Sequence, residues 1–248
     1  MMRWSRQILF GDVDAMFASA AVLADPSLAG KPVAVGGSSP RGIIAAASYA
    51  ARAFGVHSAM PTGEATRLCP QLILIPPDRP LYRRLHEHMQ AVTDQLFPLT
   101  EWSSIDEFYA DTTQLQTRHP DPRSLGQLAK DALYKATGLR CTIAVATGKT
   151  VAKIAADSHK PDGLVTVQPG AEEAFLALRP LRALPGIGPK TAARLEPLGL
   201  KTIGDLLDQQ WDQPLRQIFG TRLYWVRELA RGIDHEPVVA DRESKSLS

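Results

Sequence analysis

Two short acidic clusters are the residues of this sequence whose type and spacing best suit chemistry. Asp12 and Asp14 come just after the apolar run 7–10, and Asp106 and Glu107 follow a second strand-like stretch much later in the chain. Carboxylates that converge from two strands suit a hard divalent cation, because Mg²⁺ prefers oxygen ligands from a few carboxylates and from substrate phosphates. The two clusters therefore predict metal-dependent phosphoryl chemistry.

The same acidic residues also have structural interpretations. A strand-end aspartate is common, and Asp14 suits the N-cap of a helix expected over residues 15–23. Neighbouring residues on a regular strand face opposite sides, so Asp106 and Glu107 can reach one metal site only if the backbone bends there. Ser104, just before them, is expected to set the backbone at that bend.

A few other side chains could meet a ligand, although none indicates a function by itself. Phe17 lies on the first turn of the expected helix, where a core aromatic is an equally ordinary interpretation. Tyr49 and Arg52 form an i, i+3 pair on one helix face, which is also a common surface arrangement. Lys160 lies in the turn 159–163, where a lysine is usually just solvated.

The composition is that of an ordinary globular protein. The 248 residues are 44% hydrophobic and 22% charged, and no run of about twenty apolar residues suggests a membrane span. Asp12 and Asp14 interrupt the N-terminal apolar stretch, which argues against a signal peptide. Cys69 and Cys141 lie far apart without metal-like spacing, so we expect buried thiols in a cytoplasmic protein. The net charge of +2 favours no partner, so nucleic-acid binding must rest on local motifs.

Periodicity divides the chain into a mixed α/β part and a helical part. The expected strands cover residues 7–10, 32–35, 43–47, 72–75, 100–112 and 142–146. The expected helices cover residues 15–23, 48–52, 79–97, 125–136 and 149–157. After Pro169 and Gly170 only short helices are expected.

One segment of the helical part is a helix–hairpin–helix signature. It is the run LPGIGPKTAARL at residues 184–195, whose glycines permit a tight turn and present amide N–H groups to phosphate. Such a hairpin binds the backbone of duplex DNA without reading its sequence. Gly186, Gly188 and Lys190 are therefore the expected DNA-binding residues.

Six segments agree in order and spacing with one known family. They are DVDAMF, KPVAVGG, RGIIAAASYAARAFGVHSAMP, SSIDE, AKIAADSHKPDG and LPGIGPKTAARL. With these motifs the sequence resembles a Y-family translesion DNA polymerase of the DNA polymerase IV type, from about residue 8 to the end. The resemblance implies an α+β fold. A ferredoxin-like palm would cover residues 1–15 and 80–167, small α/β fingers 16–79, and an all-helical thumb with the helix–hairpin–helix 168–236.

The resemblance also implies roles for individual residues. The catalytic carboxylates would be Asp12, Asp106 and Glu107, and these with the Val13 carbonyl would hold two Mg²⁺ ions, or Mn²⁺ in their place. The residues expected to bind the nucleotide are Met16, Phe17, Tyr49, Arg52 and Lys160. Within this set Phe17 would be the steric gate, whose ring leaves no room for the 2′-hydroxyl of a ribonucleotide. Tyr49, Arg52 and Lys160 would clamp the phosphates.

The implied activity is template-directed addition of deoxynucleotides to a primer 3′ end, with low fidelity, in translesion repair synthesis. The expected partners are primer–template DNA and the incoming dNTP, and the protein is expected to be a monomer with no membrane contact. Residues 237–248 look like a linker to a little-finger domain that this chain lacks, and a sliding clamp would bind only through that absent region. Ala46 and Gly148 depart from the family pattern, and from Ala46 we expect a slightly weaker grip on the nucleotide.

Two rival interpretations fit these residues less well. A catalytically silent DNA-binding homologue of the same fold would lose its metal carboxylates, whereas Asp12, Asp106 and Glu107 are all present. A nucleotide cyclase, another two-metal palm enzyme, would need a glycine-rich acidic hairpin and would leave the helix–hairpin–helix unexplained.

Overall fold

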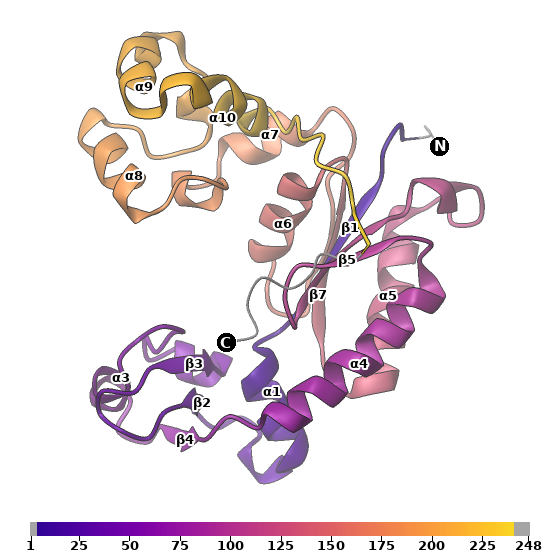
Figure 1. Ribbon diagram of the computed structural model, residues 1–248, viewed down its shortest axis with the longest axis vertical. Helices are drawn as coiled ribbons and strands as arrows, with labels where there is room; N and C mark the ends of the chain where they lie inside the picture. Colours follow the sequence, from indigo (N-terminus) through magenta and orange to yellow (C-terminus); the bar gives the residue numbers. More distant parts are fainter. Residues whose placement is uncertain (1–3, 241–248) are drawn as a thin grey trace.

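The computed structural model describes residues 4–240, which form two sheets and a helical end (Figure 1). The strands are β1 (Ile8–Val13), β2 (Val33–Gly36), β3 (Ile44–Ala47), β4 (Ile73–Ile75), β5 (Thr100–Trp102), β6 (Glu107–Asp111), β7 (Cys141–Ala146) and β8 (Leu164–Thr166). The α-helices are α1 (Met16–Ala24), α2 (Tyr49–Arg52), α3 (Thr62–Leu68), α4 (Arg79–Leu96), α5 (Pro122–Thr137), α6 (Lys149–Asp157), α7 (Glu172–Ala177), α8 (Pro189–Leu195), α9 (Asp212–Phe219) and α10 (Leu223–Ala230). Within 4–240 no helix has both the length and the hydropathy that a bilayer span requires.

The large sheet has the strand order β5-β6-β1-β7-β8 and separates two apolar cores. Side chains alternate along β1, so Leu9 lies in the core formed with α4 and α5, while Ile8 and Phe10 lie in the core formed with α6. β1 is antiparallel to both β6 and β7, and β7 is parallel to β8. This arrangement confirms the expected α+β fold with a ferredoxin-like palm.

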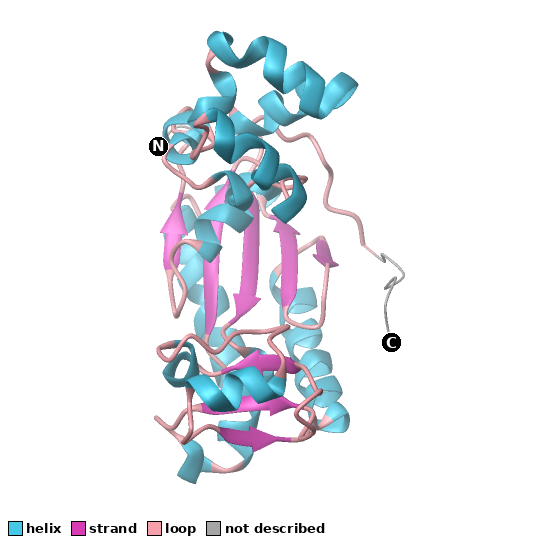
Figure 2. Ribbon diagram, turned by 90° about the vertical axis from the view of Figure 1, so that its left-hand side faces the viewer, coloured by secondary structure: helices cyan, strands magenta, loops and turns pink. Residues whose placement is uncertain are grey.

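A separate small sheet, β3-β2-β4, precedes the helix α2 that carries Tyr49 and Arg52 (Figure 2). Figure 2 shows its strands running crosswise below the large sheet. The Ser48 hydroxyl accepts a hydrogen bond from the Ala51 N–H and so caps α2 directly after β3. The strand-to-helix transition expected at residues 43–52 is therefore present, and it places Tyr49 at the first position of α2.

The first strand is longer than expected. The expected strand covers residues 7–10 and ends before Gly11, but β1 continues through Asp12 to Val13. A Cβ at Gly11 would lie 2.3 Å from the Phe108 ring, so glycine is required here by the close approach of β6 and does not break the strand. Asp12 is consequently held inside a six-residue strand.

Two further expectations about strands were incomplete. The stretch 100–112, predicted as one strand, is the hairpin of β5 and β6, whose turn contains Ser104 and Asp106. The short strand β8 was not predicted, because it has only three residues and follows a turn directly. Its parallel pairing with β7 places the turn 160–163 at the edge of the large sheet.

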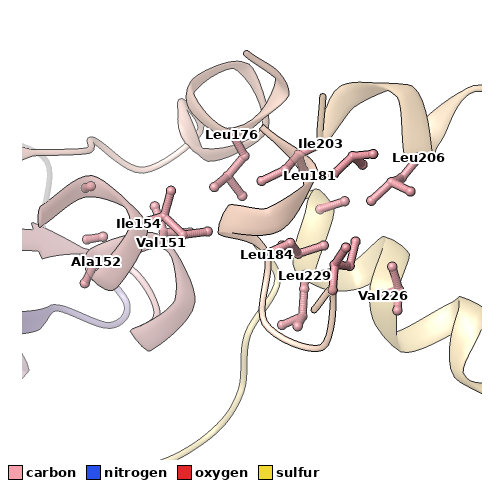
Figure 3. Close-up of a cluster of buried hydrophobic side chains, with 14 of the residues drawn as sticks. Val151, Ala152, Ile154, Leu176, Leu181, Leu184, Ile203, Leu206, Val226 and Leu229 are labelled. Atoms are coloured by element: carbon pink, nitrogen blue, oxygen red, sulfur yellow. The ribbon is translucent and has the colours of Figure 1, made fainter. Parts of the chain in front are cut away.

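The helical end shares its apolar core with α6 (Figure 3). Figure 3 shows Val151 and Ile154 of α6 beside Leu176, Leu184 and Leu229. All five side chains are buried in one continuous cluster. The helical end is therefore packed on the helix that covers the large sheet.

Residues 233–239, called the return segment here, run from α10 back along the large sheet (Figure 1). The Asp234 carboxylate accepts hydrogen bonds from the backbone N–H and the hydroxyl of Thr150, both at 2.8 Å. The Val239 N–H donates to the buried Glu101 carboxylate at 2.8 Å, and this carboxylate forms an ion pair with Lys149 at 2.6 Å. The return segment thus supplies a cap to α6 and joins the helical end to the large sheet a second time.

Candidate active site

The register of the large sheet brings the two acidic clusters together. Asp12 of β1 lies directly opposite Glu107 of β6, and the next pair on the same face is Phe10 with Tyr109. Asp12 is only 4% exposed, whereas Glu107 is half-buried. Because directly opposed residues share one face of the sheet, both carboxylates project to the α6 side.

Asp106 reaches the same region because the backbone bends in the β5–β6 hairpin. The Ser104 hydroxyl accepts a hydrogen bond from the Glu107 N–H at 3.1 Å and donates one to the Asp106 carboxylate. The Asp106 carbonyl accepts from the Val13 N–H at 3.0 Å, which fixes the bend against the end of β1. The bend that a shared site requires is therefore present, and Ser104 stabilises it.

Two lysines supply positive charge to the opposed carboxylates. Lys160 is in direct ion-pair contact with Asp12, and the Lys153 Nζ lies 2.6 Å from a Glu107 carboxylate oxygen. Burial raises the pKa of the Asp12 carboxyl to about 7; Lys160 opposes this rise, while Glu107 and Asp106 add to it. Within residues 4–240 no three His, Cys, Asp or Glu side chains are grouped tightly enough to hold a metal. The ammonium groups of Lys153 and Lys160 lie at Glu107 and Asp12. Asp12, Asp106 and Glu107 nevertheless supply the carboxylate oxygens that a divalent metal ion prefers.

Asp14 does not cap α1 as expected. The residue at the start of that helix is Ala15, in the left-handed region at φ 47°, and it makes no side-chain capping hydrogen bond. The Asp14 carboxylate is instead buried and accepts hydrogen bonds from Thr142, Tyr49 and the backbone N–H of Asp162. The expected cap is absent because the Asp14 carboxylate accepts hydrogen bonds from donors that lie far away in the chain.

A hollow of about 170 Å³ collects the nine residues that the sequence predicted for the metals and the nucleotide. Its lining consists of Asp12, Val13, Ala15, Met16, Phe17, Ala45, Ala46, Tyr49, Arg52, Ser58, Asp106, Glu107 and Lys160. Beside Ala15, the residues Ala45, Ala46 and Ser58 of this lining have small side chains. The hollow is therefore lined by carboxylates, by cations and by small residues.

Aromatic contacts hold the nucleotide-side residues in place. The Phe17 ring stacks on Tyr82 of α4 with 4.2 Å between ring centroids. The Arg52 guanidinium lies 4.6 Å from the centre of the Tyr49 ring, and its Nε donates to the Ala47 carbonyl. Burial and the nearby Asp14 carboxylate raise the pKa of Tyr49 to about 12, so its hydroxyl stays a hydrogen-bond donor at neutral pH.

A larger groove of about 650 Å³ lies between the large sheet and the helical end. Glu107 lines both this groove and the smaller hollow, so the two spaces adjoin at this carboxylate. Lys153 lines it on the sheet side, and the exposed rings of Tyr224 and Trp225 line it on the helical side.

The predicted DNA-binding residues lie apart from the hollow, in the helical end. Gly186 has φ +87°, and a Cβ there would approach Arg222 to 2.9 Å, so glycine is required at this position. Gly188 precedes α8 and has open space around its Cα. Lys190 is exposed in the first turn of α8.

Sequence reasoning missed Lys153 and the contacts of Asp14. Lys153 lies in a quoted motif, but only its placement on the sheet-facing side of α6, opposite β6, brings it to Glu107. Nothing in the local sequence marks Thr142 or Asp162 as a partner of Asp14, because these contacts join residues far apart in the chain.

Comparison with known proteins agrees with this arrangement. Residues 11–157 match a family described as the impB/mucB/samB family, and residues 169–200 match the HHH motif of the IMS family. Among curated relatives, DNA polymerase IV of Halorhodospira halophila is 42% identical over 248 residues, which is 99% of this chain and 69% of that protein. DNA polymerase IV of Methanoculleus marisnigri is 40% identical over 252 residues and is covered to the same 69%.

Solved structures are similar over nearly the whole chain. The insertion ternary complex of Dbh DNA polymerase matches with a TM-score of 0.84 and 31% identity, over 94% of this chain and 69% of that one. DinB from Sulfolobus solfataricus matches with a TM-score of 0.85 and 31% identity, over the same shares of the two chains.

Proposed function

Because this chain belongs to the impB/mucB/samB family and carries the core of a Y-family translesion DNA polymerase, we propose that the small hollow is where it joins a deoxynucleotide to a primer 3′ end. The primer hydroxyl would attack the α-phosphorus of a template-paired dNTP and release pyrophosphate. The hollow supports this because acidic, basic and aromatic groups meet in it at the end of the large sheet.

The opposed carboxylates would hold the metals. Asp12, Asp106 and Glu107, with the Val13 carbonyl, are the proposed ligands of two Mg²⁺ ions, and Mn²⁺ is proposed to serve in their place. Bound there, the metals would lower the pKa of the primer hydroxyl and neutralise charge on the triphosphate. Asp12 is fixed inside β1 and Asp106 by the hairpin bend, so the protein holds these oxygens without help from the substrate.

Cationic and hydroxyl groups that line the hollow would bind the triphosphate. Lys160 and Arg52 supply positive charge, and the protonated Tyr49 hydroxyl supplies a hydrogen-bond donor. Such groups stabilise charge that builds up on phosphate oxygens during transfer. Met16 and Phe17 would contact the sugar, and the Phe17 ring, held against Tyr82, would exclude a 2′-hydroxyl.

The small residues that line the hollow support low fidelity. Ala45, Ala46 and Ser58 leave room beside the nascent base pair, so shape would discriminate poorly between correct, incorrect and damaged pairs. A roomy pocket is the property that bypass of a damaged template base requires.

Primer–template DNA is proposed to lie in the larger groove. Since Glu107 borders both spaces, a primer whose end lies at Glu107 would meet the nucleotide in the small hollow. Gly186, Gly188 and Lys190 would contact the DNA backbone without reading sequence.

The two free cysteines are buried, which supports the proposed cytoplasmic location.

The observation that carries the proposal is the direct opposition of Asp12 and Glu107, with Asp106 held beside them. Primer extension by the parent protein with Mg²⁺ and dNTPs is therefore compared with extension by Asp106→Ala, which should be slower by at least about 100-fold. Asp111→Ala is the matched control, since this carboxylate lies at the far end of β6, away from the hollow. Equal rates for Asp106→Ala and the parent would contradict the metal assignment.

A further inference from the structure

We propose that Asp14 is a positioning residue, which holds Tyr49 and the turn bearing Lys160 at a fixed separation before a nucleotide binds. The inference rests on the proposed function, because the separation matters only if Tyr49 and Lys160 both contact the triphosphate. It also gives a role to a carboxylate that the metal site does not use.

The contacts of the Asp14 carboxylate come from three parts of the chain. The residue is 4% exposed, and its Oδ1 accepts from the Thr142 hydroxyl of β7 at 2.9 Å and from the Tyr49 hydroxyl of α2 at 3.3 Å. Its Oδ2 accepts from the backbone N–H of Asp162 at 2.8 Å. One buried carboxylate thus links the large sheet, the helix that follows β3 of the small sheet, and the turn 160–163.

The turn is also held from its other side. The Asp162 carboxylate forms ion pairs with Lys130 of α5 and with Arg140, both at 2.8 Å. With Asp14 on its backbone and two cations on its side chain, the turn that begins at Lys160 is fixed between β1 and α5. The backbone from which the Lys160 side chain extends is therefore held by contacts made before any ligand arrives.

The chemistry of the contact favours positioning over local helix stability. A buried carboxylate is costly unless its oxygens accept hydrogen bonds, and α1 offers none, since its first turn is not capped by a side chain. Two of the three donors to Asp14 belong to α2 and to the turn 160–163, which together carry the three proposed phosphate ligands. Groups that are already in place lose less conformational freedom when the ligand binds, so affinity for the triphosphate should depend on Asp14.

The test is the Kd of dATP, with Mg²⁺, for the full chain bound to a primer–template whose primer ends in a dideoxynucleotide. In Asp14→Asn an amide group replaces one acceptor oxygen, and we expect the Kd to rise about tenfold, the size of a lost hydrogen bond to a charged group. Thr142→Val, which removes one donor to Asp14, should also raise the Kd. Asp25→Asn is the matched control, because Asp25 is an exposed aspartate that caps only the turn at 26–28, and its Kd should equal that of the parent.

A double variant separates positioning from a general loss of structure. If Asp14 acts through the lysine turn, Asp14→Asn should change the Kd little when Lys160→Ala is already present. Parent-like binding by Asp14→Asn and Thr142→Val, beside weak binding by Lys160→Ala, would overturn the positioning role and leave the clamp standing. Parent-like binding by both Lys160→Ala and Arg52→Ala would overturn the clamp, and the role of Asp14 with it. If Asp14→Asn no longer unfolds cooperatively, the test rests on the Thr142→Val variant. An unchanged Kd of dATP for Thr142→Val then overturns the inference.

Discussion

Asp12 and Glu107 are directly opposed residues of one antiparallel strand pair, and each carboxylate is paired with its own lysine. Like charges opposite each other destabilise a strand pair. Lys160 and Lys153 offset that repulsion, so the protein keeps two carboxylates side by side at the end of its central strands. The two carboxylates proposed for catalysis are thus kept in the sheet although their repulsion lowers its stability.

The raised pKa of Asp12 leads to a pH dependence of metal binding. Metal binds the ionised carboxylate, and a pKa of about 7 means that the proton must be displaced below that pH. The affinity for Mn²⁺ should therefore rise between pH 6 and pH 8, by about tenfold for one titrating ligand of this pKa, and change little above pH 8. Electron paramagnetic resonance of free Mn²⁺ measures this affinity. Asp12→Asn should weaken Mn²⁺ binding and make it depend less on pH. Equal affinity at pH 6 and pH 8 in the parent would contradict the assignment.

The stacking of Phe17 on Tyr82 makes sugar selectivity testable. Phe17→Ala removes the ring from the hollow, so ribonucleotide incorporation relative to deoxynucleotide incorporation should rise by at least about tenfold. Tyr82→Phe keeps an aromatic ring beneath Phe17 and serves as the control, with selectivity close to that of the parent. Single-nucleotide extension with rATP and dATP gives both values. Unchanged selectivity in Phe17→Ala would place the gate elsewhere.

The cap that Asp234 provides predicts a coupling with position 148. A Cβ at Gly148 would lie 3.1 Å from the Asp234 Cβ, so Gly148→Asn should displace Asp234 while itself capping α6. Asp234→Ala alone should lower the free energy of unfolding by about 1 kcal/mol. When Gly148→Asn is already present, Asp234→Ala should leave the free energy of unfolding almost unchanged. Urea unfolding measures both values. Faster hydrogen exchange of the Val239 amide in Gly148→Asn would show that the return segment is released. If the two substitutions lower the free energy of unfolding additively in the double variant, the coupling is contradicted.

The exposed position of Lys190 predicts a contact that is electrostatic and independent of sequence. Lys190→Ala should weaken binding to duplexes of different sequence by the same factor and reduce the slope of log K against log salt by about one. Lys135→Ala, an equally exposed lysine on α5, should change neither quantity. Fluorescence anisotropy over a range of salt concentrations measures both. A loss confined to some sequences would contradict the backbone contact.

Much of this site could be predicted because its residues lie in short local patterns. The acidic clusters and the lysine turn each follow or precede an apolar run, and strand ends gather such residues at one place. The continuation of β1 through Gly11 could not be predicted, because glycine is required there by the Phe108 ring of another strand. Asp14 was misread because its donors are distant in the chain, and a capping pattern is only a local preference.

The Ala-rich helix α6 has a mechanical consequence for the large groove. One of its sides lies on Ile8 and Phe10 of the large sheet, and its Val151 and Ile154 belong to the core of the helical end. Swinging the helical end outward would expose that shared apolar surface to water at about 25 cal/mol for each Å². The packing on both sides of α6 therefore helps to fix the width of the groove, together with the contacts of the return segment.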